Sequence, residues 1–216
     1  MGRLENCRAA VFDLDGTLLR SNHVWSGIDE KFLGKRGFEV PGDYFKVISV
    51  MNLDQAAVYT RERFGLEDSI ESIRQEWTDM AIYEYSHVIG EVDGAADFLR
   101  LLKSRGVKIA LATASLPELY EPALKRLGMY PQFDAFATTA EVERGKGFPD
   151  VYELACRRLG EMPEDTVVFE DIIEGVRGAR AGGFGTAACL NSHYAADRDK
   201  LIAESDLSFE SYRELM

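Results

Sequence analysis

The sequence predicts an α/β fold, in which a parallel sheet with helices on both faces is interrupted by a mainly α-helical insertion. Helical and strand-like patterns alternate from about residue 90 onward, which is typical of a parallel sheet. Residues 21–89 contain helical patterns but no convincing strand alternation. The 216 residues, 46% of them hydrophobic, suffice for one core domain with one insertion. We therefore assign residues 1–20 and 90–216 to the core and residues 21–89 to the helical domain.

The first strand is a short apolar run that begins at Ala9 and leads into Asp13. The insertion follows, and its clearest helical patterns span 53–64 and 69–85. Neither segment alternates apolar and polar residues as a half-buried strand would.

The remaining elements alternate along the second half of the chain. Pro149 suits the first turn of one helix, and Gly182 suits the end of another. The predicted strands span 108–113, 134–138, 167–170 and 186–190, with a last short segment at 207–209, and the predicted helices span 94–105, 117–127, 149–159 and 174–181.

Two carboxylates follow the first strand. Asp13 and Asp15 lie one residue apart, and the chain turns directly after them at Gly16. Both side chains can reach the space beyond the carboxyl end of the strand, where ligands bind in open α/β sheets. An Asp-Gly pair is also ordinary turn chemistry, so this segment alone leaves a purely structural role open.

Further polar residues lie at later strand ends. Thr113 ends one predicted strand, Glu170 and Asp171 end another, and Lys146 precedes a Pro-Asp pair that opens a helix. Each has a structural alternative. A threonine at this position is also typical of a helix cap, and a lysine beside glycine is typical of a solvated surface. An acidic pair is typical of a helix start, where the helix dipole stabilises it.

Together, these four segments resemble the four motifs of the haloacid dehalogenase-like superfamily, and in particular its β-phosphoglucomutase/phosphatase-like subgroup, which carries a helical cap after the first motif. The resemblance spans nearly the whole chain and implies a Rossmann-like core, with residues 21–89 as the cap domain. It also implies that Asp13 attacks phosphorus to form an aspartyl-phosphate, and that Asp15 is the general acid and base.

The same resemblance implies how a phosphate is held. Thr113, with the neighbouring Ala114 and Ser115, would bind a transferring phosphoryl oxygen through its hydroxyl and nearby backbone N–H groups. Lys146 would offset the negative charge of the phosphate and of the aspartates. The family usually has a proline after this lysine, whereas this chain has Gly147.

The fourth motif implies an Mg²⁺ site. Asp13, the backbone carbonyl of Asp15, and Asp171 would supply the protein ligands, with Glu170 in or just outside the first coordination shell. The family often has a serine or threonine after the acidic pair. This chain has Ile172, which is expected to weaken a hydrogen bond near the metal but not the metal site itself.

The insertion is expected to select the substrate. His23, Trp25 and Asn52 are candidate contacts there, and Thr17 is a candidate in the first motif, although aromatic residues at helical spacing commonly serve packing. β-Phosphoglucomutases have a histidine where this chain has Trp25 and an arginine where it has Asn52. Thr17 also follows Gly16 as in the phosphatases, which disfavours the mutase.

The resemblance therefore implies an Mg²⁺-dependent phosphatase that hydrolyses a small phosphomonoester, of the sugar or polyol phosphate type. A phosphosugar mutase is one alternative, and a non-catalytic protein that binds a phosphorylated ligand is another. Dehalogenases lack the second aspartate of the first motif, and Asp15 argues against that chemistry.

The composition of the chain limits the classes of partner that we expect it to bind. The net charge of −12 and the pI near 4.8 disfavour binding to nucleic acid or to an anionic membrane. No apolar run approaches a membrane span, and the N-terminal residues lack a signal-peptide core, so we expect a cytoplasmic protein, most simply a monomer. Three scattered cysteines, Cys7, Cys156 and Cys189, predict packed thiols and no disulfide framework.

Overall fold

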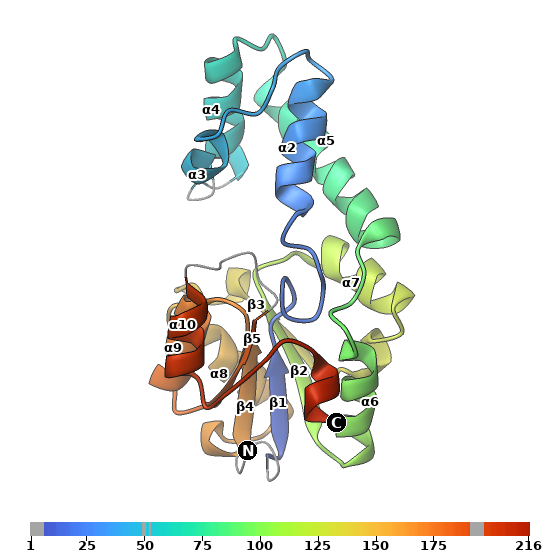
Figure 1. Ribbon diagram of the computed structural model, residues 1–216, viewed down its shortest axis with the longest axis vertical. Coiled ribbons are helices and arrows are strands. Elements are labelled where there is room, and N and C mark those ends of the chain that lie inside the picture. Colours follow the sequence, from blue (N-terminus) through green and yellow to red (C-terminus); the bar gives the residue numbers. More distant parts are fainter. Residues whose placement is uncertain (1–6, 49–50, 52, 191–196) are drawn as a thin grey trace. The chain divides into compact units, whose positions relative to one another are not determined.

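The computed structural model describes residues 7–48, 51, 53–190 and 197–216 of the chain (Figure 1). The chain forms two compact units. One contains the residues up to Asn22 together with Ile89–Met216, and we call it the core unit. The other is His23–Val88, which we call the helical unit.

A six-stranded sheet forms the centre of the core unit, and every pair of neighbouring strands is parallel. The strand order is β3-β2-β1-β4-β5-β6. This confirms the predicted α/β class with a parallel sheet. The strands are β1 (Ala9–Phe12), β2 (Lys108–Thr113), β3 (Ala135–Thr138), β4 (Thr166–Glu170), β5 (Gly185–Cys189) and β6 (Leu207–Phe209).

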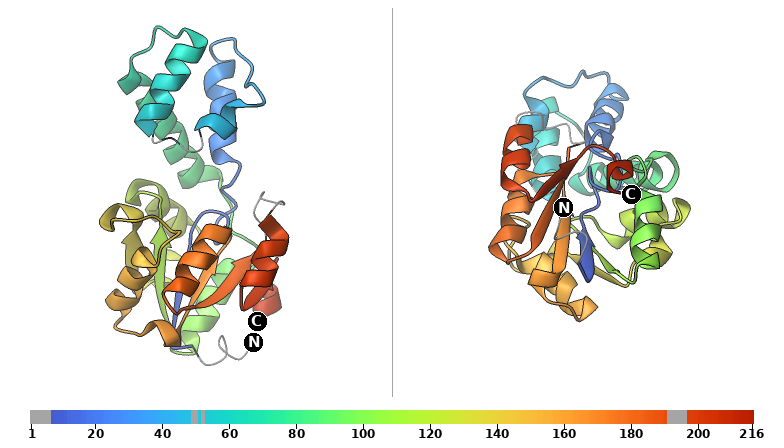
Figure 2. Two further views of the ribbon diagram at one scale, coloured as in Figure 1. Left: turned by 90° about the vertical axis from the view of Figure 1, so that its left-hand side faces the viewer. Right: turned by 60° about the horizontal axis from the view of Figure 1, so that its bottom comes forward.

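Helices cover both faces of this sheet, as Figure 2 shows. Alternate residues of each strand point to opposite faces. The small side chains of β1, β2 and β3 on one face, such as Ala110 and Ala137, pack with α8 (Asp150–Leu159) in one buried cluster, which α9 (Ile173–Ala181) joins through Ala179. The helix α10 (Arg198–Glu204) packs against α9.

The opposite face of the sheet carries larger side chains. The rings of Phe12 and Phe169 stack there with centroids 4.3 Å apart, and Phe98 of α6 (Ala95–Ser104) packs edge-on against both. Phe136 of β3 stacks on Tyr120 of α7 (Pro117–Arg126) on the same face. Aromatic pairs of this kind add to the stability gained from apolar burial.

Because β1 is flanked by β2 and β4 in a parallel sheet, the carboxyl ends of these three strands lie side by side. Asp13 follows β1 directly, Ala114 follows β2, and Asp171 follows β4. The sheet thus gathers residues that are far apart in the sequence at one edge, where α/β proteins bind their ligands.

The described residues of the helical unit form four helices and a terminal π-helical turn. These are α2 (Val24–Gly34), α3 (Tyr44–Ile48), α4 (Leu53–Phe64), α5 (Ile70–Tyr83) and η1 (Glu84–Val88). Phe32 and Trp77 form its core with ring centroids 5.4 Å apart. Arg36, two residues after α2, lies over the Phe32 ring and forms ion pairs with Asp68, two residues before α5, and with Glu76 of α5.

One buried acid in the helical unit leads to a pH prediction. Asp29 of α2 is 5% exposed, and its Oδ2 has no hydrogen-bond partner among the residues that the structure describes. Burial raises the pKa of Asp29 to about 7, with a further contribution from the charge of Glu30. Below this pKa the folded state holds a proton that the unfolded chain releases near its ordinary pKa.

The free energy of unfolding should therefore fall as pH rises from about 5 to 8, by about 2 kcal/mol from this group. Asp29→Asn should remove that part of the fall, as measured by urea unfolding at several pH values. Glu62→Gln is the matched control, because Glu62 is exposed on α4 of the same unit and does not contribute to the raised pKa of Asp29. A fall with the same slope in wild type and Asp29→Asn would contradict the prediction.

Two other sequence expectations concern the whole chain. No helix among the described residues is both long and apolar enough to cross a bilayer. Cys156 and Cys189 are buried, as predicted for packed side chains, whereas Cys7 is only partly buried.

Candidate active site

Asp13 is the first residue after β1 and lies at the centre of the site. Its backbone N–H continues the sheet by donating to the Phe169 carbonyl at 2.9 Å, which fixes the start of the loop. Its side chain is buried, with an exposed fraction of 4%. Lys146 Nζ donates to Oδ1, and the Thr17 hydroxyl donates to Oδ2 at 2.9 Å. Both carboxylate oxygens are thus oriented by the protein.

The turn after Asp13 requires glycine. Gly16 has φ of 83°, a conformation that side chains with a Cβ rarely adopt. A Cβ there would also lie 2.0 Å from Asp171 Oδ2. The loop from β1 therefore comes into close contact with the residue that follows β4.

Asp15 is held by two serine hydroxyls. Ser21 Oγ donates to Oδ1 and Ser115 Oγ donates to Oδ2, each at 2.6 Å. These serines come from different segments, because Ser21 belongs to the residues after β1 and Ser115 to those after β2. The bonds fix the orientation of a carboxylate that is only partly buried.

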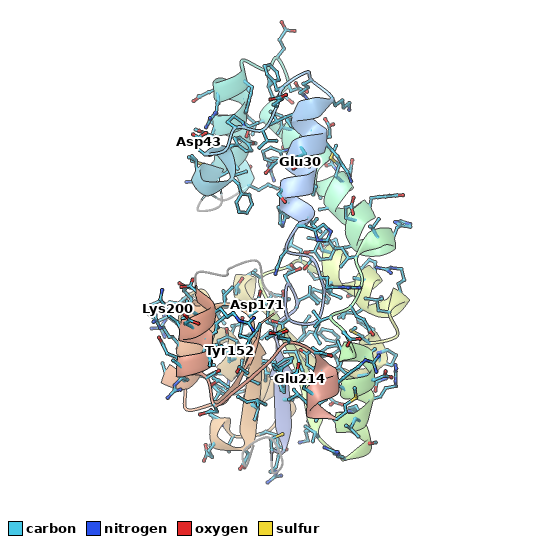
Figure 3. The ribbon with its side chains drawn as sticks, viewed as in Figure 1. Glu30, Asp43, Tyr152, Asp171, Lys200 and Glu214 are labelled. Atoms are coloured by element: carbon cyan, nitrogen blue, oxygen red, sulfur yellow. The ribbon has the colours of Figure 1, made fainter. Side chains whose placement is uncertain are left out.

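A second set of bonds surrounds Glu170. Its Oε1 accepts from Lys146 Nζ at 2.7 Å and from the Tyr152 hydroxyl at 2.8 Å, and its Oε2 accepts from the Asp171 N–H at 3.3 Å. Lys146 therefore bridges Glu170 and Asp13. Tyr152 and Asp171 are labelled within the core unit in Figure 3.

Burial and like charges shift the pKa values of this cluster. Burial raises the pKa of Asp13, and the charges of Glu170 and Asp15 add to the rise while Lys146 opposes it. Burial likewise raises the pKa of Asp171 well above its ordinary value, aided by the charges of Asp13 and Glu170. Burial disfavours the charged form of Lys146, but the carboxylates of Asp13 and Glu170 outweigh it and raise its pKa. The protein alone leaves the negative charge here incompletely neutralised.

The acidic residues fit a hard divalent cation. Asp13, Glu170 and Asp171 are all buried. One carboxylate oxygen from each residue lies within 4.8 Å of the oxygens from the other two. Mg²⁺ prefers oxygen ligands of this kind. The Asp15 side chain is not part of this group.

The residues after β2 lie beside the same loop. Thr113 is fully buried, and its Oγ1 accepts from the Ser115 N–H at 2.9 Å. Ala114 is exposed between them. Thr17, predicted as a substrate contact, is also fully buried and donates to Asp13 instead of projecting into open space.

The loop that carries Lys146 packs against α9 at a glycine. A Cβ on Gly178 would lie 2.1 Å from the Lys146 carbonyl oxygen and 2.9 Å from that of Phe148. The loop is also joined to the start of α8, because Arg144 forms an ion pair with Asp150 at 2.8 Å and lies over the Phe148 ring. Gly178 thus permits the approach that places Lys146 between its two carboxylates.

Gly178→Ala should therefore reduce activity although alanine is the better helix former. We expect kcat/KM to fall about tenfold or more, because small displacements of a charged group at a reacting centre have large effects. Gly34→Ala in α2 is the matched control, since nothing lies within 4 Å of a Cβ there. Wild-type kinetics of a folded Gly178→Ala variant would contradict the proposed packing requirement.

The remaining predicted contacts belong to the helical unit or fall outside the described residues. His23 and Trp25 belong to the helical unit, at the start of α2, and both are exposed. Asn52 lies outside the described residues. Ile172 precedes α9 and makes no side-chain cap to that helix.

Sequence reasoning missed Tyr152 and Ser21. Tyr152 follows Asp150 on a helix whose apolar face predicts burial, and this periodicity could have indicated a buried hydroxyl in need of a partner. No local signal indicates that Ser21 would bond to Asp15, since that contact depends on how the loop after Gly16 closes.

Comparison with known proteins agrees with this geometry. A family model described as haloacid dehalogenase-like hydrolase matches residues 7–183. A phosphorylated carbohydrates phosphatase from Thermotoga maritima is 27% identical over 187 residues, with 85% of this chain and 87% of that protein covered. Validoxylamine A 7′-phosphate phosphatase from Streptomyces hygroscopicus subsp. limoneus is 25% identical over 224 residues, with 96% and 95% covered.

A solved structure from Thermotoga maritima, provisionally assigned as a beta-phosphoglucomutase, superimposes with a TM-score of 0.81. It is 25% identical to this chain, and the alignment covers 94% of each chain.

Proposed function

Because the chain belongs to the haloacid dehalogenase-like hydrolases and is a phosphoric monoester hydrolase, we propose that it hydrolyses small sugar or polyol phosphates through an aspartyl-phosphate on Asp13. The observation that carries this proposal is the environment of the Asp13 carboxylate. It is buried at the end of β1, with Lys146 on one oxygen, Thr17 on the other, and Asp15 two residues away.

In the first half-reaction, a carboxylate oxygen of Asp13 forms a bond to phosphorus as the bond from phosphorus to the ester oxygen breaks. Asp15 gives its proton to the departing alkoxide, so that an alcohol leaves. Lys146 offsets the repulsion between the Asp13 carboxylate and the phosphate. Thr113, Ala114 and Ser115 are proposed to hold the phosphoryl oxygens.

In the second half-reaction, water attacks phosphorus while Asp15, now ionised, takes a proton from it. The bond from phosphorus to Asp13 breaks, which releases phosphate and restores both carboxyl groups. The hydrogen bonds from Ser21 and Ser115 hold Asp15 in one orientation, which suits a group that must act twice at the same place.

The metal is proposed to be Mg²⁺. Asp13 and Asp171 would hold it together with the Asp15 carbonyl, and Glu170 would lie in or next to its ligand set. When bound, it supplies positive charge that offsets the phosphate and the acidic residues. Glu170 also accepts from Lys146 and Tyr152, so we propose that it fixes the lysine as well.

Residues 21–89 are proposed to act as a cap that selects the substrate, with His23, Trp25 and Asn52 as candidate contacts. The names of two relatives, one acting on phosphorylated carbohydrates and the other on a validoxylamine phosphate, support a polyhydroxylated substrate. The proposed compartment is the cytoplasm.

A phosphate-release assay over a panel of sugar and polyol phosphates, with Mg²⁺ present, tests the proposal. We expect turnover of several members. No release from any substrate, with phosphorylated ligands still binding, would favour a non-catalytic binding protein.

A second assay separates the phosphatase from the mutase. The protein is incubated with β-glucose 1-phosphate, Mg²⁺ and a trace of glucose 1,6-bisphosphate, and glucose 6-phosphate is measured against free phosphate. We expect phosphate to dominate, because Trp25 supplies no charge where a mutase has its histidine. Faster accumulation of glucose 6-phosphate than of free phosphate would favour the mutase over the proposed phosphatase.

A further inference from the structure

The C-terminal segment of the core unit returns to the loop that follows β1. It lies beyond residue 183, where the match to the family model ends, and consists of β6 and η6 (Tyr212–Leu215). Its central residue is Tyr212, which is fully buried. The residues between Asp13 and Thr17 are thus supported by a part of the chain outside the family match.

The Tyr212 hydroxyl donates to the backbone carbonyl of Thr17 at 3.2 Å. Thr17 in turn donates its own hydroxyl to Asp13 Oδ2 at 2.9 Å. Two hydrogen bonds in series therefore connect the C-terminal segment with one carboxylate oxygen of Asp13. The other oxygen is bound by Lys146.

The position of Tyr212 is itself well determined. Its ring packs among four phenylalanine rings at centroid distances from 4.7 to 6.3 Å, those of Phe12, Phe98, Phe169 and Phe209. Its N–H donates to the Asp93 carbonyl at 3.0 Å. Ser211 and Arg213 on either side bond to the Asp93 side chain. A hydroxyl on so constrained a ring has little freedom to move away from Thr17.

We propose that Tyr212 is a positioning residue for the reaction, which acts through Thr17 to orient the Asp13 carboxylate. This inference rests on the proposed function, since it takes Asp13 to be the nucleophile. Thr17 lies in the loop that follows the turn at Gly16, so the direction of its hydroxyl depends on how that loop is held. The buried hydroxyl of Tyr212 gives that loop an attachment to the rigid aromatic face of the sheet.

Tyr212→Phe tests the proposal, because phenylalanine keeps the ring and its packing and removes only the hydroxyl. With p-nitrophenyl phosphate as substrate, kcat should fall about fivefold while KM stays within about twofold, since the change affects the reacting geometry more than binding. The bond is long for a hydroxyl donor, and a modest change is therefore expected.

A double-mutant cycle with Thr17→Val shows whether Tyr212 acts through Thr17. If it does, adding Tyr212→Phe to Thr17→Val should leave kcat unchanged, because the bond to Asp13 is already lost. Equal falls in kcat in both backgrounds would overturn the proposal, as would a wild-type kcat for Tyr212→Phe.

Ser211→Ala is the matched control. It weakens the same segment at Asp93 but leaves the bond to Thr17 in place, so its kcat should be that of wild type at a similar loss of Tm. The backbone N–H groups of Leu18 and Leu19 both donate to the Leu14 carbonyl at 2.9 Å. Amide hydrogen exchange at these two residues should accelerate in Tyr212→Phe and not in Ser211→Ala. Equal exchange in the two variants would also overturn the proposal.

Different results would reject the proposed function and the role of Tyr212. Turnover by Asp13→Asn would reject the proposed function. An inactive Asp13→Asn together with fully active Tyr212→Phe would reject only the role of Tyr212.

Discussion

Asp13→Asn should fold like the wild type and lose phosphatase turnover by about a thousandfold or more, because an amide has nearly the same shape but does not attack phosphorus. The fold should be retained because Asp13 is one of three buried carboxylates gathered near a single lysine. Removing one negative charge reduces their mutual repulsion, so Tm should not fall.

Asp134→Asn is the matched control for this variant. Asp134 lies at the other end of the sheet, before β3, where it accepts from the Ile109 N–H and from Lys103. It should lose some stability and keep wild-type kcat. Comparing kcat and Tm of the two variants separates a chemical role from a structural one.

A direct measurement can also locate the intermediate. Borohydride reduction of an acyl phosphate converts the aspartate that carries it into homoserine, which peptide mass spectrometry identifies by position. We expect the modification at Asp13 in the presence of substrate. Modification at Asp15 instead, or substantial turnover by a contaminant-free Asp13→Asn preparation, would falsify the assignment of the nucleophile.

Removal of divalent metal should abolish activity, and added Mg²⁺ should restore it. Asp13, Glu170 and Asp171 are buried together, and Lys146 is the cation that contacts two of them. Without a metal ion, a phosphate would enter a site with excess negative charge. Ca²⁺ should restore little, because its larger and looser coordination misplaces the nucleophile. Full activity in chelator would reject this part of the mechanism.

Metal binding has a second readout that does not depend on turnover. An ion that binds only the folded state stabilises it, by about 2.7 kcal/mol at a concentration 100 times Kd. Mg²⁺ should therefore raise the Tm of the wild type, and Asp171→Asn should lose this response. Asp134→Asn should keep it. An equal Mg²⁺ response in Asp171→Asn and wild type would place the ion elsewhere.

Short amphipathic helices were the part of the fold that sequence reasoning described least well. The pattern identified α4 and α5 but did not single out α2, α3 or α10. α2 begins at Val24, and the preceding His23 provides no side-chain cap, while α10 has only seven residues. Such helices are stabilised by packing more than by local propensity, so the sequence pattern predicts them weakly.

The α/β class, the strands and the residues at their carboxyl ends can be predicted from local sequence patterns. Apolar runs with strand composition end at Phe12, Thr113 and Glu170, and this pattern is local. Because the carboxyl ends of neighbouring parallel strands share one edge, it was enough to place Asp13, Thr113 and Asp171 in one region.

The pairing of the side chains, in contrast, depends on long-range packing that no local pattern encodes. Lys146 lies 133 residues from Asp13 and 24 from Glu170, and no local pattern encodes that it contacts both. The contact of Tyr212 with the Thr17 carbonyl spans 195 residues and depends on the packing of an aromatic cluster. Hydrogen bonds and close approaches of this kind depend on side-chain directions within the assembled core, which the sequence specifies only through the complete fold.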